Sequence, residues 1–133
     1  DCPHGLMVDL RGENPVLVVA DRSNRRLQNF TLDGQHINFV TDAMRAPCHF
    51  HTYGDVMVVP DLESRVTLLD KNNQLIAVLG QGPGYQGLRD KTRDHFPPGQ
   101  FVAPHSAYFD HAGNIFVVEW VEVGRVTKLR KIA

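Results

Sequence analysis

Short apolar runs recur along the chain and are separated by turn-forming residues. Three of these runs are continuous and rich in β-branched residues; they cover residues 16–19, 56–59 and 115–118. Continuous apolar runs of this length predict strands that are buried on both faces of a sheet. Gly, Asn and Asp gather between the runs, as at residues 33–34 and 113–114, and predict turns. No stretch has convincing amphipathic helical periodicity, so we expect an all-β protein.

Two further segments, residues 65–69 and 125–129, alternate apolar and polar side chains. Alternation of this kind predicts strands with one face toward solvent. Residues 81–100 differ from both patterns, because they are rich in Gly, Pro and charged side chains. We expect a long loop there, and loops of this length inside compact domains tend to be functional or mobile.

The predicted strands fall into three units that open in the same way. The openings are Pro3-His4, Pro47-Cys48-His49 and Pro104-His105. The units cover residues 1–43, 44–80 and 101–133, and the loop at residues 81–100 separates the last two. Repetition at about 40 to 50 residues is typical of propellers and solenoids, whose units cannot bury their apolar faces alone.

Strand counts of four, four and three favour a β-propeller built from four-stranded antiparallel blades, the last blade lacking its outer strand. Propellers normally have four to eight blades, so three blades cannot close a ring. We therefore expect half of a six-bladed ring, which a second copy of the chain or a missing half completes. Open sheet edges on a half-ring favour association.

Length, charge and hydropathy limit the kinds of partner that we expect this protein to bind. The 133 residues fit one domain, and the formal net charge of −1 gives no electrostatic footprint for nucleic acid. No apolar run approaches the ~20 residues that span a bilayer, so we expect neither nucleic acid nor membrane as a partner. Cys2 and Cys48 allow at most one disulfide. Each cysteine lies within two residues of a unit-opening histidine, so a metal or redox role is one interpretation. The simpler interpretation is that both are semi-buried thiols.

Histidines near the start of each unit are candidate ligands, because symmetry would bring them together at the propeller axis. They are His4, His49 and His105, with His51 as the alternative in the second unit. Converging imidazoles with an open position suit a catalytic-type divalent metal site; zinc is favoured, and calcium or iron is the alternative. In the other interpretation these side chains line the axial channel and bind water or backbone carbonyls. The remaining histidines are expected at the surface: His36, His95 and His111.

The segments Pro3-His4-Gly5, Asp21–Asn24 (DRSN) and Pro104-His105-Ser106 resemble motifs of the NHL-repeat propellers, most of all those of the peptidyl-hydroxyglycine lyase type. That lyase domain is a six-bladed propeller with an axial metal held by three histidines, and with an Arg and a Tyr acting in its active site. The resemblance implies His4 and His105 as metal ligands and Arg22 as the catalytic arginine. It places this chain in the C-terminal half, with the remaining ligand and the Tyr in the other half.

The sequence is compatible with two functions. The first is a metal-dependent lyase or hydrolase that takes a small-molecule or peptide ligand, with no organic cofactor. The second is a binding or assembly scaffold in which any axial metal is structural. Arg22 has a structural alternative, as part of a turn that the Asp21 and Asn24 side chains stabilise. Tyr108 and Trp120 are expected in the core.

Overall fold

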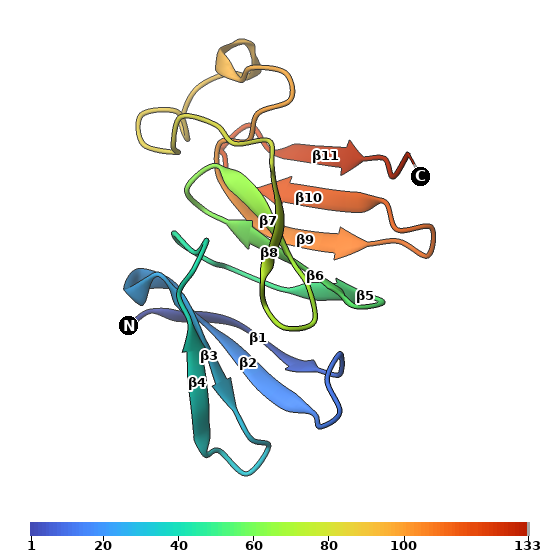
Figure 1. The fold of residues 1–133 in the computed structure, drawn as a ribbon. Helices are drawn as coiled ribbons and strands as arrows, with labels where there is room; N and C mark the ends of the chain where they lie inside the picture. Colours follow the sequence, from blue (N-terminus) through green and yellow to red (C-terminus); the bar gives the residue numbers. More distant parts are fainter. Residues whose placement is uncertain (133) are drawn as a thin grey trace.

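A computed structural model describes residues 1–132 and contains three antiparallel sheets of four, four and three strands (Figure 1). Sheet 1 comprises β1 (Pro3–Asp9), β2 (Val16–Asp21), β3 (Arg26–Phe30) and β4 (His36–Val40). Sheet 2 comprises β5 (His51–Tyr53), β6 (Val56–Asp61), β7 (Arg65–Leu69) and β8 (Leu75–Leu79). Sheet 3 comprises β9 (Pro104–Phe109), β10 (Ile115–Glu119) and β11 (Arg125–Leu129). The predicted all-β class and the strand counts are confirmed.

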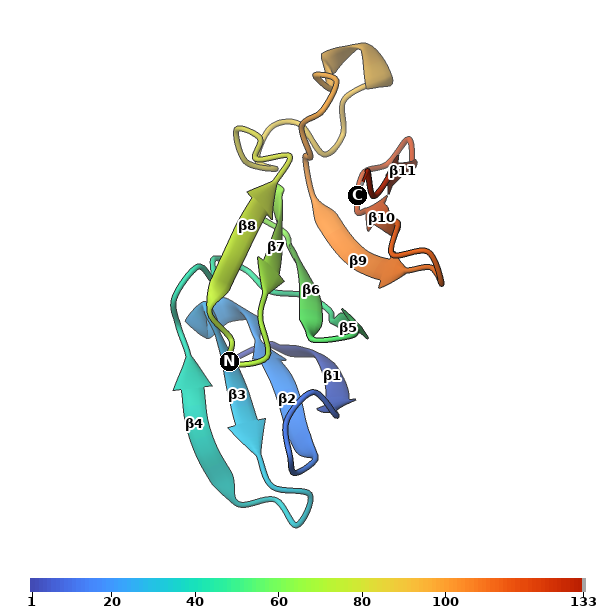
Figure 2. The same ribbon diagram turned by 45° about the vertical axis from the view of Figure 1, so that its right-hand side comes forward.

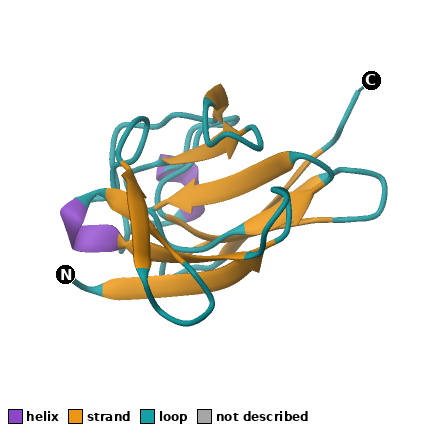
Figure 3. Cartoon of the chain, turned by 60° about the horizontal axis from the view of Figure 1, so that its bottom comes forward, coloured by secondary structure: helices purple, strands orange, loops and turns teal. Residues whose placement is uncertain are grey.

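Helical structure in the described residues is limited to two 3-10 turns, η1 (Arg22–Asn24) and η2 (Arg93–His95) (Figure 3). The second lies in the long segment between β8 and β9, which otherwise consists of turns and irregular backbone. Over residues 1–132 there is no helix with the length and apolar character required to cross a bilayer.

Within each sheet every strand pairs with the next one along the chain, so each sheet is a simple meander. Similar turns join strands in sheets 2 and 3. The Asp70 carboxylate accepts backbone hydrogen bonds from Asn72 and Gln74, each at 2.8 Å. Asp110 does the same for two residues of the β9–β10 turn, each at 2.9 Å. Such side-chain bonds satisfy turn backbone and explain why Asp precedes these turns.

The sheets stack in chain order, and the apolar core lies between them (Figure 2). One cluster joins sheets 1 and 2 and includes Val18, Leu27 and Met57. A second joins sheets 2 and 3 and includes Val58 and Val117. A third lies between the long loop and the segments that precede β5 and β9.

The longest runs of buried residues in the described strands belong to the middle sheet, whereas β2 keeps Val16, Leu17 and Val19 only half-buried. From Met57 to Asp61 every residue of β6 is buried, as predicted for a strand covered on both faces. The same prediction is wrong for β10, in which Phe116 and Val118 are exposed, because no sheet covers that face of sheet 3. The predicted alternation holds for β11, but it is wrong for β7, which lies in the covered sheet.

Candidate metal centre

One side chain from near the start of each sheet reaches a common point. The ligand atoms of His4, Cys48 and His105 all lie within 4.8 Å of one another. The two imidazoles meet edge to face, with 2.9 Å between their Nε2 atoms. His4 is exposed, His105 is half-buried and Cys48 is buried, so the group opens toward solvent on the His4 side.

The backbone explains this convergence. His4 and His105 are each the second residue of the first strand of their sheet. Cys48 precedes β5, but its segment is already paired with β6, since Pro47 bridges Asp61 and the Cys48 N–H donates to the Pro60 carbonyl at 3.0 Å. The three ligands therefore occupy equivalent places in the three sheets.

A buried acid ends the second strand of each sheet and pairs with the arginine that begins the third. The pairs are Asp21–Arg26 at 2.6 Å, Asp61–Arg65 at 3.9 Å and Glu119–Arg125. The three acids are at most 4% exposed. Buried carboxylates need such partners, because an isolated buried charge is strongly unfavourable.

These acids also hold the segments that lead into the ligands. Asp61 accepts from the backbone N–H groups of Arg45 and Ala46, at 2.7 and 2.8 Å. Glu119 accepts from the two N–H groups of residues 102–103, at 2.6 and 3.2 Å. Asp21 accepts from the N-terminal ammonium at 2.5 Å. Each ligand thus follows closely after a backbone segment that a buried carboxylate fixes.

Gly5 lets β1 approach the Cys48 segment closely. A Cβ atom at Gly5 would lie 2.5 Å from the Cys48 carbonyl oxygen and 2.9 Å from the His49 Cα atom. Only a residue without a side chain fits this contact. The close approach of sheets 1 and 2 here brings His4 next to Cys48.

Arg22 lies beside the centre. Its Nη1 atom is 3.2 Å from His4 Nε2, and its Nη2 atom donates to Cys2 Sγ at 3.2 Å. Burial lowers the pKa of His4 and of His105, and the Arg22 guanidinium lowers both further. Both imidazoles therefore favour the neutral form, which is the form that binds metal.

The Cys48 thiol is 1% exposed. Burial raises its pKa, and the nearby Arg22 only partly offsets that effect. Without a metal the group therefore stays a thiol near neutral pH. A metal ion would have to displace its proton, since the thiolate is the ligand form.

His49 and His51 lie outside this group of ligand atoms. His51 Nδ1 accepts from the Phe109 backbone N–H at 3.1 Å, and its ring lies on Tyr108, so His51 links β5 to β9. His49 Nδ1 is 3.4 Å from Ser106 Oγ. Cys48 takes the place for which His49 was predicted, whereas His4 and His105 come together as expected. His36, His95 and His111 are exposed, as predicted.

Tyr108 and Trp120 were predicted in the core, and this is wrong. They are 59% and 44% exposed; Tyr108 lies on the face of β9 opposite to the one that packs in the core between sheets 2 and 3, and Trp120 follows the end of β10. The Trp120 ring is instead covered by the Arg89 guanidinium, 3.2 Å from the ring centroid. No role was predicted for the basic residues of the long loop or of the segment before Cys48, because these residues lie in no recognisable sequence motif.

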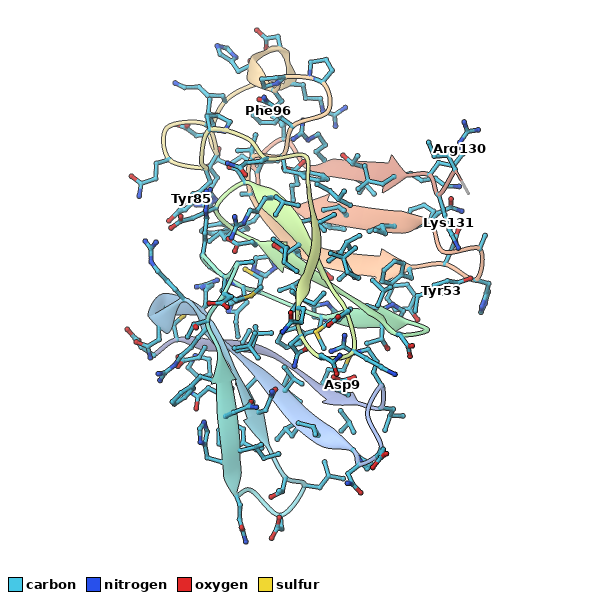
Figure 4. The ribbon with its side chains drawn as sticks, viewed as in Figure 1. Asp9, Tyr53, Tyr85, Phe96, Arg130 and Lys131 are labelled. Carbon is cyan, nitrogen blue, oxygen red and sulfur yellow. The ribbon has the colours of Figure 1, made fainter. Side chains whose placement is uncertain are left out.

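A large cavity lies elsewhere in the molecule. It measures about 780 Å³, lies between sheets 2 and 3, and includes Tyr53, Arg130 and Lys131 in its lining. Figure 4 shows these three residues on one side of the molecule and Tyr85 on the other. A smaller cavity of about 290 Å³ is lined by Tyr85 and by Arg22. The candidate centre therefore neighbours the smaller cavity.

No protein-family model matches this sequence, and no curated protein matches it significantly.

Proposed function

We propose that the three sheets are three blades of a six-bladed propeller of the NHL type, with the strands β1, β5 and β9 nearest the axis. Two observations support this proposal. Each sheet is a meander in chain order, as propeller blades are. His4 and His105 lie on the first strands of sheets 1 and 3, and Cys48 lies on the segment that precedes the first strand of sheet 2, so one residue from each unit comes to a common point.

We further propose that a second copy of the chain completes the ring. The outer face of sheet 1 exposes Leu6 and Phe39, and that of sheet 3 exposes Phe116 and Val126, at 36–68% each. Apolar side chains gathered on an open sheet face favour burial against a partner. In a two-fold dimer, sheet 1 of each copy would meet sheet 3 of the other.

The function that the geometry supports best is metal-dependent lyase or hydrolase chemistry at a centre formed by His4, Cys48 and His105. The observation that carries this proposal is the convergence of their ligand atoms within 4.8 Å. Two imidazoles and one thiolate fit zinc, with iron as an alternative, and three protein ligands leave one position open. The donor set disfavours calcium, which prefers oxygen ligands.

A bound zinc ion would supply a Lewis acid that polarises a carbonyl or acidifies a water molecule. The role of Arg22 follows from its position 3.2 Å from His4. Its guanidinium would bind a substrate carboxylate through two parallel hydrogen bonds and hold the substrate beside the centre. The exposed edge of His4 leaves the approach for that substrate open.

Zinc binding tests this proposal. Chelator-treated protein should take up one zinc ion per chain, measured by mass spectrometry of the metal after dialysis. Cys48→Ala and His105→Ala should each weaken zinc binding by ~100-fold, because each removes a ligand. His111→Ala is the matched control, since His111 is exposed on a turn. A wild-type chain that takes up no zinc, or equal weakening in the control, contradicts the proposal.

A protein-binding scaffold is the second candidate, and the apolar outer faces of sheets 1 and 3 favour it. In that case the His4 and His105 variants would lose only stability, and no hydrolase or lyase activity would depend on zinc. Activity of the zinc-loaded chain on small carboxylate-bearing substrates therefore separates the two candidates.

A further inference from the structure

A small cavity adjoins the candidate centre. It has a volume of about 290 Å³ and lies between η1, the segment before Cys48, the turn after β6 and the long loop. Three arginines, Arg22, Arg25 and Arg45, line it, together with Glu63 and Tyr85. Its size is that of a pocket for a small molecule.

The charges in this cavity do not balance. Arg25 pairs with Glu63 at 3.3 Å. In residues 1–132, no carboxylate forms an ion pair with Arg22 or Arg45. The groups beside Arg22 are the His4 ring nitrogen and the thiols of Cys2 and Cys48, none of which is a carboxylate. Arg22 and Arg45, both half-buried, thus line one cavity without a carboxylate partner, and cations placed in this way attract an anion.

Arg45 is held in place by the same carboxylate that fixes the Cys48 segment. Its backbone N–H donates to Asp61 Oδ2 at 2.7 Å, and Asp61 is fully buried. Arg22 is the residue shared with the centre, since its Nη1 atom lies 3.2 Å from His4 Nε2. The backbone of Arg45 and the guanidinium of Arg22 are therefore held relative to the candidate ligands, which limits the reorganisation that binding requires.

We propose that this cavity is an oxyanion-binding subsite, in which Arg45 and Arg22 hold a carboxylate or phosphate group of a small substrate. The inference rests on the proposed function, since it places the anionic end of the substrate next to the metal centre. Paired guanidinium groups suit both anions, because each presents planar sets of N–H donors to two oxygen atoms.

The test is titration of inorganic phosphate and, separately, of acetate into zinc-free and zinc-loaded protein by calorimetry, with ionic strength held constant by sodium chloride. We expect saturable binding of at least one of these anions. The anion that binds more tightly indicates whether the anionic group of the substrate is a phosphate or a carboxylate. Arg45→Gln should weaken it by at least ~10-fold, as expected for a charge-assisted contact. Arg130→Gln removes the same charge at another cavity and should change the affinity by less than ~2-fold.

If Arg45→Gln does not fold, Arg45→Lys should still weaken binding, because lysine loses the planar donor pair. No saturable binding of either anion, or equal weakening by Arg130→Gln, overturns the subsite. Binding in the zinc-free protein, with no zinc uptake, supports the subsite and overturns the metal centre. Zinc uptake without anion binding supports the metal centre and overturns the subsite.

Discussion

At the scale of single residues, Asp21 shows how a buried carboxylate organises its surroundings. It is 1% exposed and accepts hydrogen bonds from the N-terminal ammonium, Arg26, Asn24 and Gln28. Burial acts to raise the pKa of Asp21, but these donors outweigh it and hold the pKa well below its usual range. The folded state therefore prefers the ionised form.

This preference predicts a pH dependence of stability. Because the pKa of Asp21 is lower in the folded chain than the ~3.9 of an unfolded one, its contribution is present above about pH 4 and is lost as the pH falls. Asp21→Asn should reduce the free energy of unfolding by about 2 kcal/mol at pH 7, through the loss of hydrogen bonds to a buried carboxylate. Urea denaturation at pH 7 and pH 3 should show a smaller pH difference in this variant.

Asp33→Asn is the control for that experiment, since Asp33 lies in the exposed β3–β4 turn. A pH difference in Asp21→Asn equal to that of the wild type would contradict the account.

Sequence spacing could have identified Cys48 in place of His49. The ligand follows its proline directly in Pro3-His4 and Pro104-His105, and the residue that follows Pro47 is Cys48. The place of a residue within the repeated unit thus identifies the candidate ligand better than its residue type does. Arg45 and Tyr85 could not be predicted in this way, because the cavity that they line is formed by loops from different parts of the chain.

At the scale of elements, the centre depends on the contact between β1 and the segment before β5. Gly5 is the point of closest approach, where an added Cβ atom would lie 2.5 Å from the Cys48 carbonyl oxygen. The backbone atoms on both sides of this contact have paired neighbours and cannot move freely.

Gly5→Ala should therefore separate sheet 1 from the Cys48 segment. We expect a loss of about 1–3 kcal/mol in unfolding free energy, as for overpacked cores, and zinc binding ~10-fold weaker than in the wild type. Gly12→Ala is a matched control, because the nearest atom to its added Cβ would be 3.8 Å away. Denaturation and zinc titration of the two variants check this; equal zinc affinities would contradict it.

The elements themselves were largely predictable from the sequence. Strand positions followed from short apolar runs and Asp- or Gly-containing turns, because these are local signals. The burial of each face was not predictable for β7 and β10, because it depends on which sheet lies alongside. Similar apolar runs are buried in the middle sheet and half exposed at the end of the stack.

At the scale of the whole molecule, the two open faces predict self-association. Light scattering at micromolar concentration should give about 30 kDa, twice the 14.9 kDa of one chain. Val126→Asp, on the outer face of sheet 3, should shift the mass toward the monomer. Leu32→Asp alters an exposed apolar residue of the β3–β4 turn, away from both faces, and should leave the mass unchanged. A wild-type monomer contradicts closure by a second copy.

We propose that Cys48 joins His4 and His105 as a metal ligand, and X-ray absorption at the zinc edge of the zinc-loaded chain tests this ligand set. We expect one sulfur at ~2.3 Å from zinc and two imidazole nitrogens at ~2.0–2.1 Å. Cys48→Ala should remove the sulfur shell. A zinc ion surrounded by nitrogen and oxygen alone in the wild-type chain would exclude Cys48 as a ligand.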